Sequence, residues 1–145
     1  MLAVGTYTKE YVDACRSKVA LHVSAYKSLV AAATSVASGG TSSVNVALKA
    51  FEPVYFGNLL IALDSHFVHR LRGIEGKDGN PLNEVRMLCS SMMGNNNVLH
   101  ADKTIKYVPD KAVLKYQIGE AIRLREPDFL LLSEAFLGEI ERKYV

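Results

Sequence analysis

The polar residues between positions 64 and 86 have the types and spacing best suited to chemistry. The segment reads DSHFVHRLRGIEGKDGNPLNEVR and mixes histidines with cations, carboxylates and amides. Its glycines and the Asp78-Gly79 dipeptide predict a loop. Asn80 and Pro81 then predict the start of a helix, with asparagine as N-cap and proline as the first helical residue. This helix–loop–helix junction is the first candidate for a functional site.

An anion site is the first chemistry that the junction predicts. Free backbone N–H groups at the start of a helix carry partial positive charge, and nearby cationic side chains add full charges for a phosphate or carboxylate. The alternative is structural: Asn80 only caps the helix, while the arginines pair with Asp64, Glu75 and Glu84. The residues predicted to hold a small anionic ligand are Arg70, Arg72, Lys77, Asn80, Asn83 and Arg86.

A metal site is the second chemistry that the junction suggests. His66 and His69 are three residues apart and Asp64 precedes them, so one ion on that side of a helix is within their reach. Against this, the two histidines diverge by about 60° on ideal helical spacing. The sequence also has neither HExxH nor a repeated Glu-x-x-His. The alternative is one half-buried and one exposed histidine, and no cofactor is identified.

Arg16 and His22 form a third candidate pair, near the N-terminus. His22 interrupts an apolar stripe, so it either finds a hydrogen-bond partner such as Tyr26 in the core or faces a ligand cavity. The Arg-x5-His spacing resembles the active-site motif of the HEPN class of small helical ribonucleases. That resemblance implies an arginine and a histidine, paired across a dimer, acting on an RNA phosphodiester. The family usually places the motif on a late helix, and here the two side chains project about 120° apart.

Apolar spacing predicts two long helices in the first half of the chain. The first covers about residues 8–37 and packs along a partner helix, and the glycines of Ser38–Ser43 end it. The second covers about residues 44–71, where Pro53 predicts a kink or a short break at 50–52 because proline has no N–H to donate. The predicted inner residues are Val12, Cys15, Val19, His22, Tyr26, Leu29, Ala33 and Val36 in the first helix, and Phe56, Leu60, Leu63, Phe67 and Leu71 in the second.

Two shorter helices follow, with an extended insertion between them. They cover about residues 81–93 and 127–143. Residues 104–108 and 121–124 resemble short strands and predict a small β-hairpin. The fold is therefore predicted to be mainly α, a four-helix bundle-like domain with antiparallel long helices and a hairpin before the last helix. The predicted inner residues are Leu82, Val85, Leu88, Cys89 and Met92, then Phe129, Leu132, Phe136, Ile140 and Tyr144.

Composition narrows the class of protein. A chain of 145 residues, 49% hydrophobic and 22% charged, predicts one globular domain over residues 1–145. The net charge of +2 does not favour a nucleic-acid partner. The longest apolar run, Leu59–Leu63, is far shorter than the roughly 20 residues of a membrane span. Cys15 and Cys89 match no disulfide or zinc pattern and no secretory signal is evident, which predicts the reducing cytoplasm.

Residues 51–86, with the block GKDGNPLNEVR, resemble a small family of uncharacterised bacterial helical proteins. The likeness extends through GEAIRL and the last predicted helix, and it implies a helical fold but no activity. No complete catalytic constellation occurs in the sequence. We therefore predict a helical binding or regulatory module, a homodimer through its apolar seam, that holds a small anionic ligand at the junction. The alternative is an enzyme, either a histidine-dependent metal-binding hydrolase or a HEPN-like ribonuclease.

Overall fold

The computed structural model describes residues 2–36 and 43–145, and it confirms a mainly helical fold. The predicted break at 38–42 and the end of the first helix at Ala37 lie outside the described residues, as does the side chain of Val36. The described elements are α1 (Lys9–Val36), α2 (Ser43–Ser65), α3 (Arg72–Glu75), α4 (Pro81–Gly94), the 3-10 helix η1 (Pro109–Lys111) and α5 (Glu126–Tyr144).

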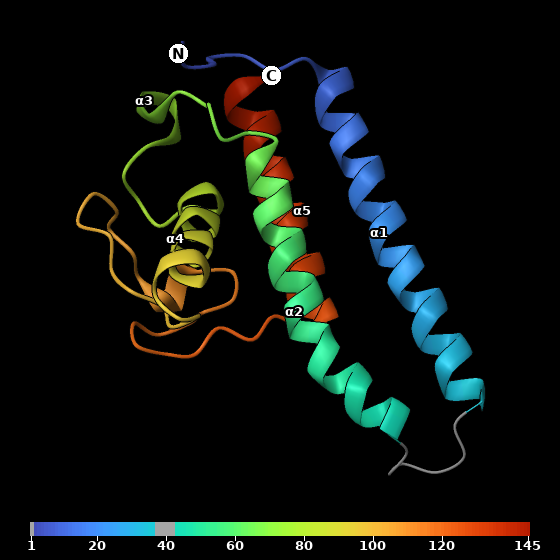
Figure 1. Ribbon diagram of the computed structural model, residues 1–145. Coiled ribbons are helices and arrows are strands. Elements are labelled where there is room, and N and C mark those ends of the chain that lie inside the picture. Colours follow the sequence, from blue (N-terminus) through green and yellow to red (C-terminus); the bar gives the residue numbers. More distant parts are fainter. Residues whose placement is uncertain (1, 37–42) are drawn as a thin grey trace.

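Helices α2 and α5 lie together at the centre of the molecule, with α1 on one side and α4 on the other (Figure 1). The long helices α1 and α2 run in opposite directions, and their connected ends extend past the start of α5 (Figure 1). One hydrophobic core joins the four helices, because each contributes an apolar stripe. Its fully buried side chains include Phe56, Leu60, Phe67, Leu82, Leu88, Phe129, Leu132 and Phe136.

The predicted apolar stripe of α1 is confirmed at Val12, Cys15 and Tyr26, which are buried, and it is wrong at His22 and Leu29. His22 is exposed, and its Nδ1 lies 2.7 Å from the Lys18 carbonyl oxygen, whereas Val23 is only 6% exposed. Leu29 is likewise exposed, and its neighbour Val30 packs against the core. A stripe through His22 and Leu29 and a stripe through Val23 and Val30 both give spacings of three and four residues. The sequence pattern therefore does not distinguish the two stripes. The surfaces of the neighbouring helices select the phase that buries valine.

Helix α2 is continuous through Pro53, so of the predicted kink or short break at 50–52 the break does not occur. Side chains on both sides of the proline pack against other helices, and this tertiary packing outweighs one lost hydrogen bond. The helix also ends at Ser65, earlier than predicted. The following chain pairs with the N-terminal segment instead: the Val4 N–H donates to His69 O at 2.7 Å, and the Leu71 N–H donates to Val4 O at 2.8 Å. Leu71, predicted to be an inner residue, is consequently exposed.

The predicted β-hairpin is wrong, since residues 2–36 and 43–145 contain no strand. The two extended segments do not pair with each other. Instead, Lys106 forms an isolated bridge with Asp78, and Ala121 forms one with Val98. Extended backbone was therefore recognised from the sequence, but its hydrogen-bond partners are the loops before and after α4.

Helices α4 and α5 agree with the predicted ones within one residue at each end. Asn80 is the N-cap of α4 and Pro81 is its first residue. Both positions follow from local chemistry. The Asn80 side chain accepts N–H groups that have no partner inside the helix, and Pro81 has no N–H that would need one. The predicted inner residues of α5 are all buried, namely Phe129, Leu132, Phe136, Ile140 and Tyr144.

Substitution of the adjacent residues Val23 and His22 tests which face of α1 packs against the core. Val23→Asp places a charge in the core, so it is expected to lower the free energy of unfolding by more than about 2 kcal/mol. His22→Asp changes an exposed side chain and is expected to stay within about 0.5 kcal/mol of the wild type. Urea unfolding monitored by circular dichroism measures both. Equal losses of unfolding free energy in the two variants would contradict the burial of Val23 and the exposure of His22.

Candidate functional site

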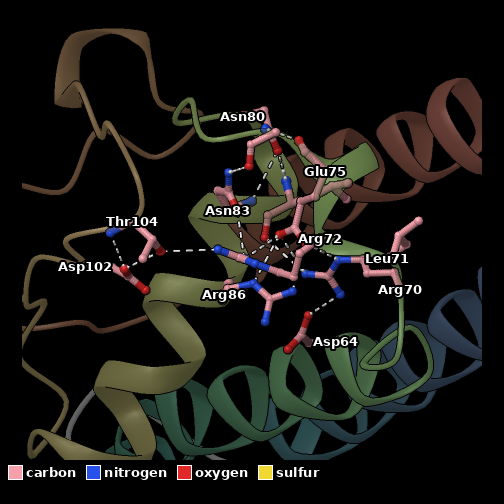
Figure 2. Close-up of polar contacts among 12 residues, drawn as sticks. Asp64, Arg70, Leu71, Arg72, Glu75, Asn80, Asn83, Arg86, Asp102 and Thr104 are labelled. Atoms are coloured by element: carbon pink, nitrogen blue, oxygen red, sulfur yellow. Dashed lines mark hydrogen bonds and ion pairs between the residues drawn. The ribbon is translucent and has the colours of Figure 1, made fainter. Parts of the chain in front are cut away.

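The carboxylate of Glu75 occupies the centre of the junction. The residue is 0% exposed and lies at the end of the one-turn helix α3. Arg86 of α4 binds it with two hydrogen bonds, Nε to Oε1 at 3.1 Å and Nη2 to Oε2 at 2.8 Å. Arg70 and Arg72 donate to Oε1 at 3.4 and 3.3 Å (Figure 2). Three guanidinium groups therefore converge on one buried carboxylate.

The charge state of Glu75 follows from two opposed effects. Burial alone raises the pKa of this carboxyl, because a charge is unfavourable away from water. The hydrogen bonds from Arg86 and the charges of Arg70, Arg86 and Arg72 favour the ionised form, and they lower the pKa below its ordinary value. The folded protein therefore holds Glu75 as a carboxylate at neutral pH.

Arg70 is buried as deeply as its partner, with only 3% of the residue exposed. Its Nη1 donates to Asp64 Oδ1 at 2.9 Å and to the Phe67 carbonyl at 3.0 Å. The guanidinium also lies over the ring of Phe136, with 5.3 Å between its carbon and the ring centroid. Its Nε lies 3.3 Å from Glu75 Oε2 without hydrogen-bond geometry, and it has no other partner in the described chain.

Asn80 and Asn83 complete the junction from the start of α4. The Asn80 Oδ1 accepts the N–H groups of Leu82 and Asn83 at 3.0 and 3.2 Å. Its Nδ2 donates to the Glu75 carbonyl at 2.9 Å, so the cap also anchors α3. The Asn83 Nδ2 donates to the carbonyl oxygens of Gly76 and Asp78. The first N–H groups of α4 are thus used by the protein's own cap.

The residues predicted for an anion site are brought together around Glu75, with one exception. Arg70, Arg72 and Arg86 point at this carboxylate, while Lys77 lies exposed in the following loop. The side chain of Arg72 is 42% exposed and also donates to Asn83 Oδ1 and to Thr104 Oγ1, at 3.3 and 3.2 Å (Figure 2). The junction therefore contains its own anion, and the anion site stays a prediction.

Glu84 belongs to the same helix but serves a different segment. Its carboxylate is buried, and it accepts the backbone N–H groups of Val113 and Leu114 at 2.7 and 2.9 Å. Burial raises the pKa of this carboxyl more than the two hydrogen bonds lower it. Glu84 therefore fixes the loop after η1 on α4 and pairs with none of the three arginines.

The predicted metal ligands are not assembled. His66 is half-buried and His69 is exposed, and Asp64 pairs with Arg70. Across residues 2–36 and 43–145, no group of three or more His, Cys, Asp and Glu side chains has the proximity needed to hold a metal ion. Metal binding stays a prediction without a described ligand set.

The Arg16 and His22 side chains contact different groups. The Arg16 guanidinium pairs with Glu134 at 2.8 Å and with Glu141, both on α5. His22 is exposed and bonds the backbone of its own helix. A ribonuclease role for this pair stays a prediction, because within the described chain Arg16 serves to join α1 to α5.

A further feature was missed in the sequence: an apolar row on α2 whose members are exposed, except for Ile61, which packs partly against the core. Its members recur at spacings of three, four, three, four and three residues, which is the a/d pattern of a coiled coil. On ideal helical spacing the row lies roughly opposite the buried residues Phe56, Leu60 and Leu63. We call it the α2 seam; it comprises Val44, Ala47, Phe51, Val54, Asn58 and Ile61.

The α2 seam is open to solvent along most of its length. Val54 is 63% exposed and Phe51 is 39% exposed, whereas Ile61 is half-buried. Phe51 is held in place by ring contacts with Tyr26 and Tyr55, at centroid distances of 6.4 and 5.4 Å. A groove of about 400 Å³ runs beside the seam, lined by Val54, Gly57, Asn58 and Ile61 together with Met92, Asn97, Ile122, Arg123 and Leu124.

Removal of the Glu75 charge tests the buried network, by which we mean the ion pairs of Glu75 with Arg70, Arg72 and Arg86. Glu75→Gln keeps the shape but leaves Arg86 without its counter-charge and Arg70 with Asp64 alone, so the free energy of unfolding is expected to fall by about 3–5 kcal/mol. The exposed Glu120→Gln serves as control and is expected to change it by less than about 0.5 kcal/mol.

The pH dependence of stability gives a second test of the Glu75 charge. Because the folded-state pKa of Glu75 is lowered, the unfolded state binds more protons below about pH 4.3, and stability falls as the pH drops. Urea unfolding at a series of pH values should show a shallower acid loss in Glu75→Gln than in the wild type; identical acid profiles would contradict the lowered pKa.

The chain was compared with known protein families, curated proteins and solved structures. No family, curated protein or solved structure matches it. The resemblances to a bacterial helical family and to HEPN ribonucleases therefore stay predictions.

Proposed function

We propose that the protein is a helical interaction module that binds a helix of another polypeptide chain along the α2 seam. The observation that carries the proposal is the exposed a/d row of α2, which lies opposite the residues Phe56, Leu60 and Leu63 that this helix contributes to the core. Exposed apolar surface of this length is unfavourable in water, and burial against a second helix is the usual way to remove it. The partner helix would complete a bundle around α1 and α2.

Three features favour a helix as the partner. The regular three–four spacing accepts the side chains of a facing helix, and the groove beside Val54 and Ile61 adds room for them. Asn58 interrupts the apolar row once, as single asparagines do where they fix the register of paired helices. The positions that flank the seam are uncharged, which suits a partner with uncharged flanks; they are Ser43, Leu48, Ala50, Tyr55, Gly57 and Ala62.

A membrane is the competing environment for α2. By length and composition, α2 is the one helix in the described part of the chain that is apolar enough to cross a bilayer. Its polar contacts favour a protein partner instead. Glu52 accepts the N–H of Glu126 at 3.1 Å and pairs with Arg125, and Arg70 just after α2 belongs to the buried network. A spanning α2 would have to break these contacts.

A designed peptide tests the proposed function. The probe is a synthetic amphipathic helix with leucine at a and d, one asparagine at a, and uncharged flanking positions. Fluorescence anisotropy with excess peptide should show binding to the wild type. Val54→Glu is expected to weaken it at least about 10-fold, because the charge would be buried in the contact. Leu131→Glu, at an equally exposed apolar position of α5, is the matched control and should bind normally. Absent binding to the wild type, or unchanged binding to Val54→Glu, would contradict the proposal.

Anion binding at the junction is a second candidate function. Arg70, Arg72 and Arg86 outnumber the carboxylates Asp64 and Glu75 that pair with them, and Arg72 and Arg86 have side chains that are 42% and 25% exposed. Phosphate at ten times its dissociation constant should raise the melting temperature by about 3–6 °C over chloride of equal ionic strength. Arg72→Ala should abolish the shift, and Lys18→Ala on α1 should keep it. An equal shift in wild type and Arg72→Ala would contradict the site.

A further inference from the structure

We propose that the helix bound along the α2 seam is the α2 helix of a second copy of this chain, in parallel orientation. This inference rests on the proposed function and names its partner. Two identical helices related by a two-fold axis bring each seam residue against its own copy. Each layer of the interface would then contain two like residues, so that apolar side chains meet apolar ones in every layer except that of Asn58.

Asn58 selects the parallel orientation. In a parallel pair the two Asn58 amides face each other, and each donates to the oxygen of the other. In an antiparallel pair centred on the seam, Asn58 would face the methyl group of Ala47, since Val44 then opposes Ile61 and Phe51 opposes Val54. A buried amide without a partner is unfavourable by about 1–3 kcal/mol, so the parallel arrangement is preferred.

The charge pattern of α2 permits pairing with itself. Its only charged side chains before Asp64 are Lys49 and Glu52, and neither is at a seam or flanking position. Glu52 is also already neutralised by Arg125 and by the N–H of Glu126. The two α2 helices therefore do not bring like charges of their own against each other, whereas a partner chosen by charge would require charged flanks. The seam spans about 26 Å from Val44 to Ile61, enough for a short two-stranded contact.

A disulfide trap tests this arrangement. Ala47→Cys is expected to form a cross-linked dimer on mild oxidation, because a parallel pair places position 47 against itself. In an antiparallel pair the two copies of residue 47 would lie about 16 Å apart along the axis, too far for a bond. The wild type is the first control, since Cys15 and Cys89 are both buried and should not cross-link. Leu131→Cys on α5 is the second control and should stay uncross-linked.

Native mass spectrometry and light scattering at tens of micromolar protein give the mass in solution. The wild type should be a dimer, and Val54→Glu should raise its dissociation constant at least about 100-fold, because two carboxylates would be buried together. Val54 is exposed in one chain, so this variant should keep the circular dichroism of the wild type. A monomeric wild type that still binds the designed peptide would overturn self-association while leaving the proposed function in place. A dimer in which Ala47→Cys fails to cross-link, or a monomer that binds lipid vesicles and not the peptide, would also overturn it.

Discussion

The fold depends on one buried negative charge, the carboxylate of Glu75. An ionised carboxylate away from water is strongly unfavourable unless cations and hydrogen-bond donors surround it. These groups come from Arg70 after α2 and from Arg86 in α4, while Lys143 of α5 donates to the Glu75 carbonyl. The one-turn helix α3 is thereby held by α4, by α5 and by the segment that follows α2, and a shift of Arg70 or Arg86 would leave a buried charge without a partner.

Both ends of the chain meet at the same junction. Val4 bridges Arg70, and the Tyr7 N–H donates to the carbonyl of Tyr144 at 2.8 Å, while the Tyr144 hydroxyl donates to Leu71 O at 2.9 Å. The opposite ends of α1 and α2 extend beyond the start of α5 (Figure 1). The molecule is thus fastened by charge and hydrogen bonds at one end, while apolar helix surface stays uncovered towards the other. We assign binding to the α2 seam because its apolar side chains are uncovered, whereas the polar groups of the junction mainly hydrogen-bond and ion-pair with one another.

Local signals predicted the helices well where a side chain acts on nearby backbone. The cap at Asn80 and the stripe of α5 need no information beyond four residues in either direction. Predictions were wrong where two answers were locally equal. His22 and Val23 both continue the spacing of α1, and Lys106 and Ala121 are extended but pair with segments that the local pattern does not identify.

The sequence by itself determined the four longer helices, though not the end of α2 or the one-turn helix α3. It also determined that the polar residues of 64–86 gather at one helix–loop–helix junction, because caps, turns and apolar periodicity act over one to four residues. It also contained the three–four spacing of the α2 seam, but not whether that row is covered. Only the tertiary structure decided that Arg70 and Arg86 converge on Glu75 and that the α2 seam is open. Both depend on contacts between residues far apart in the chain, and on which apolar faces remain without a partner once the core has formed.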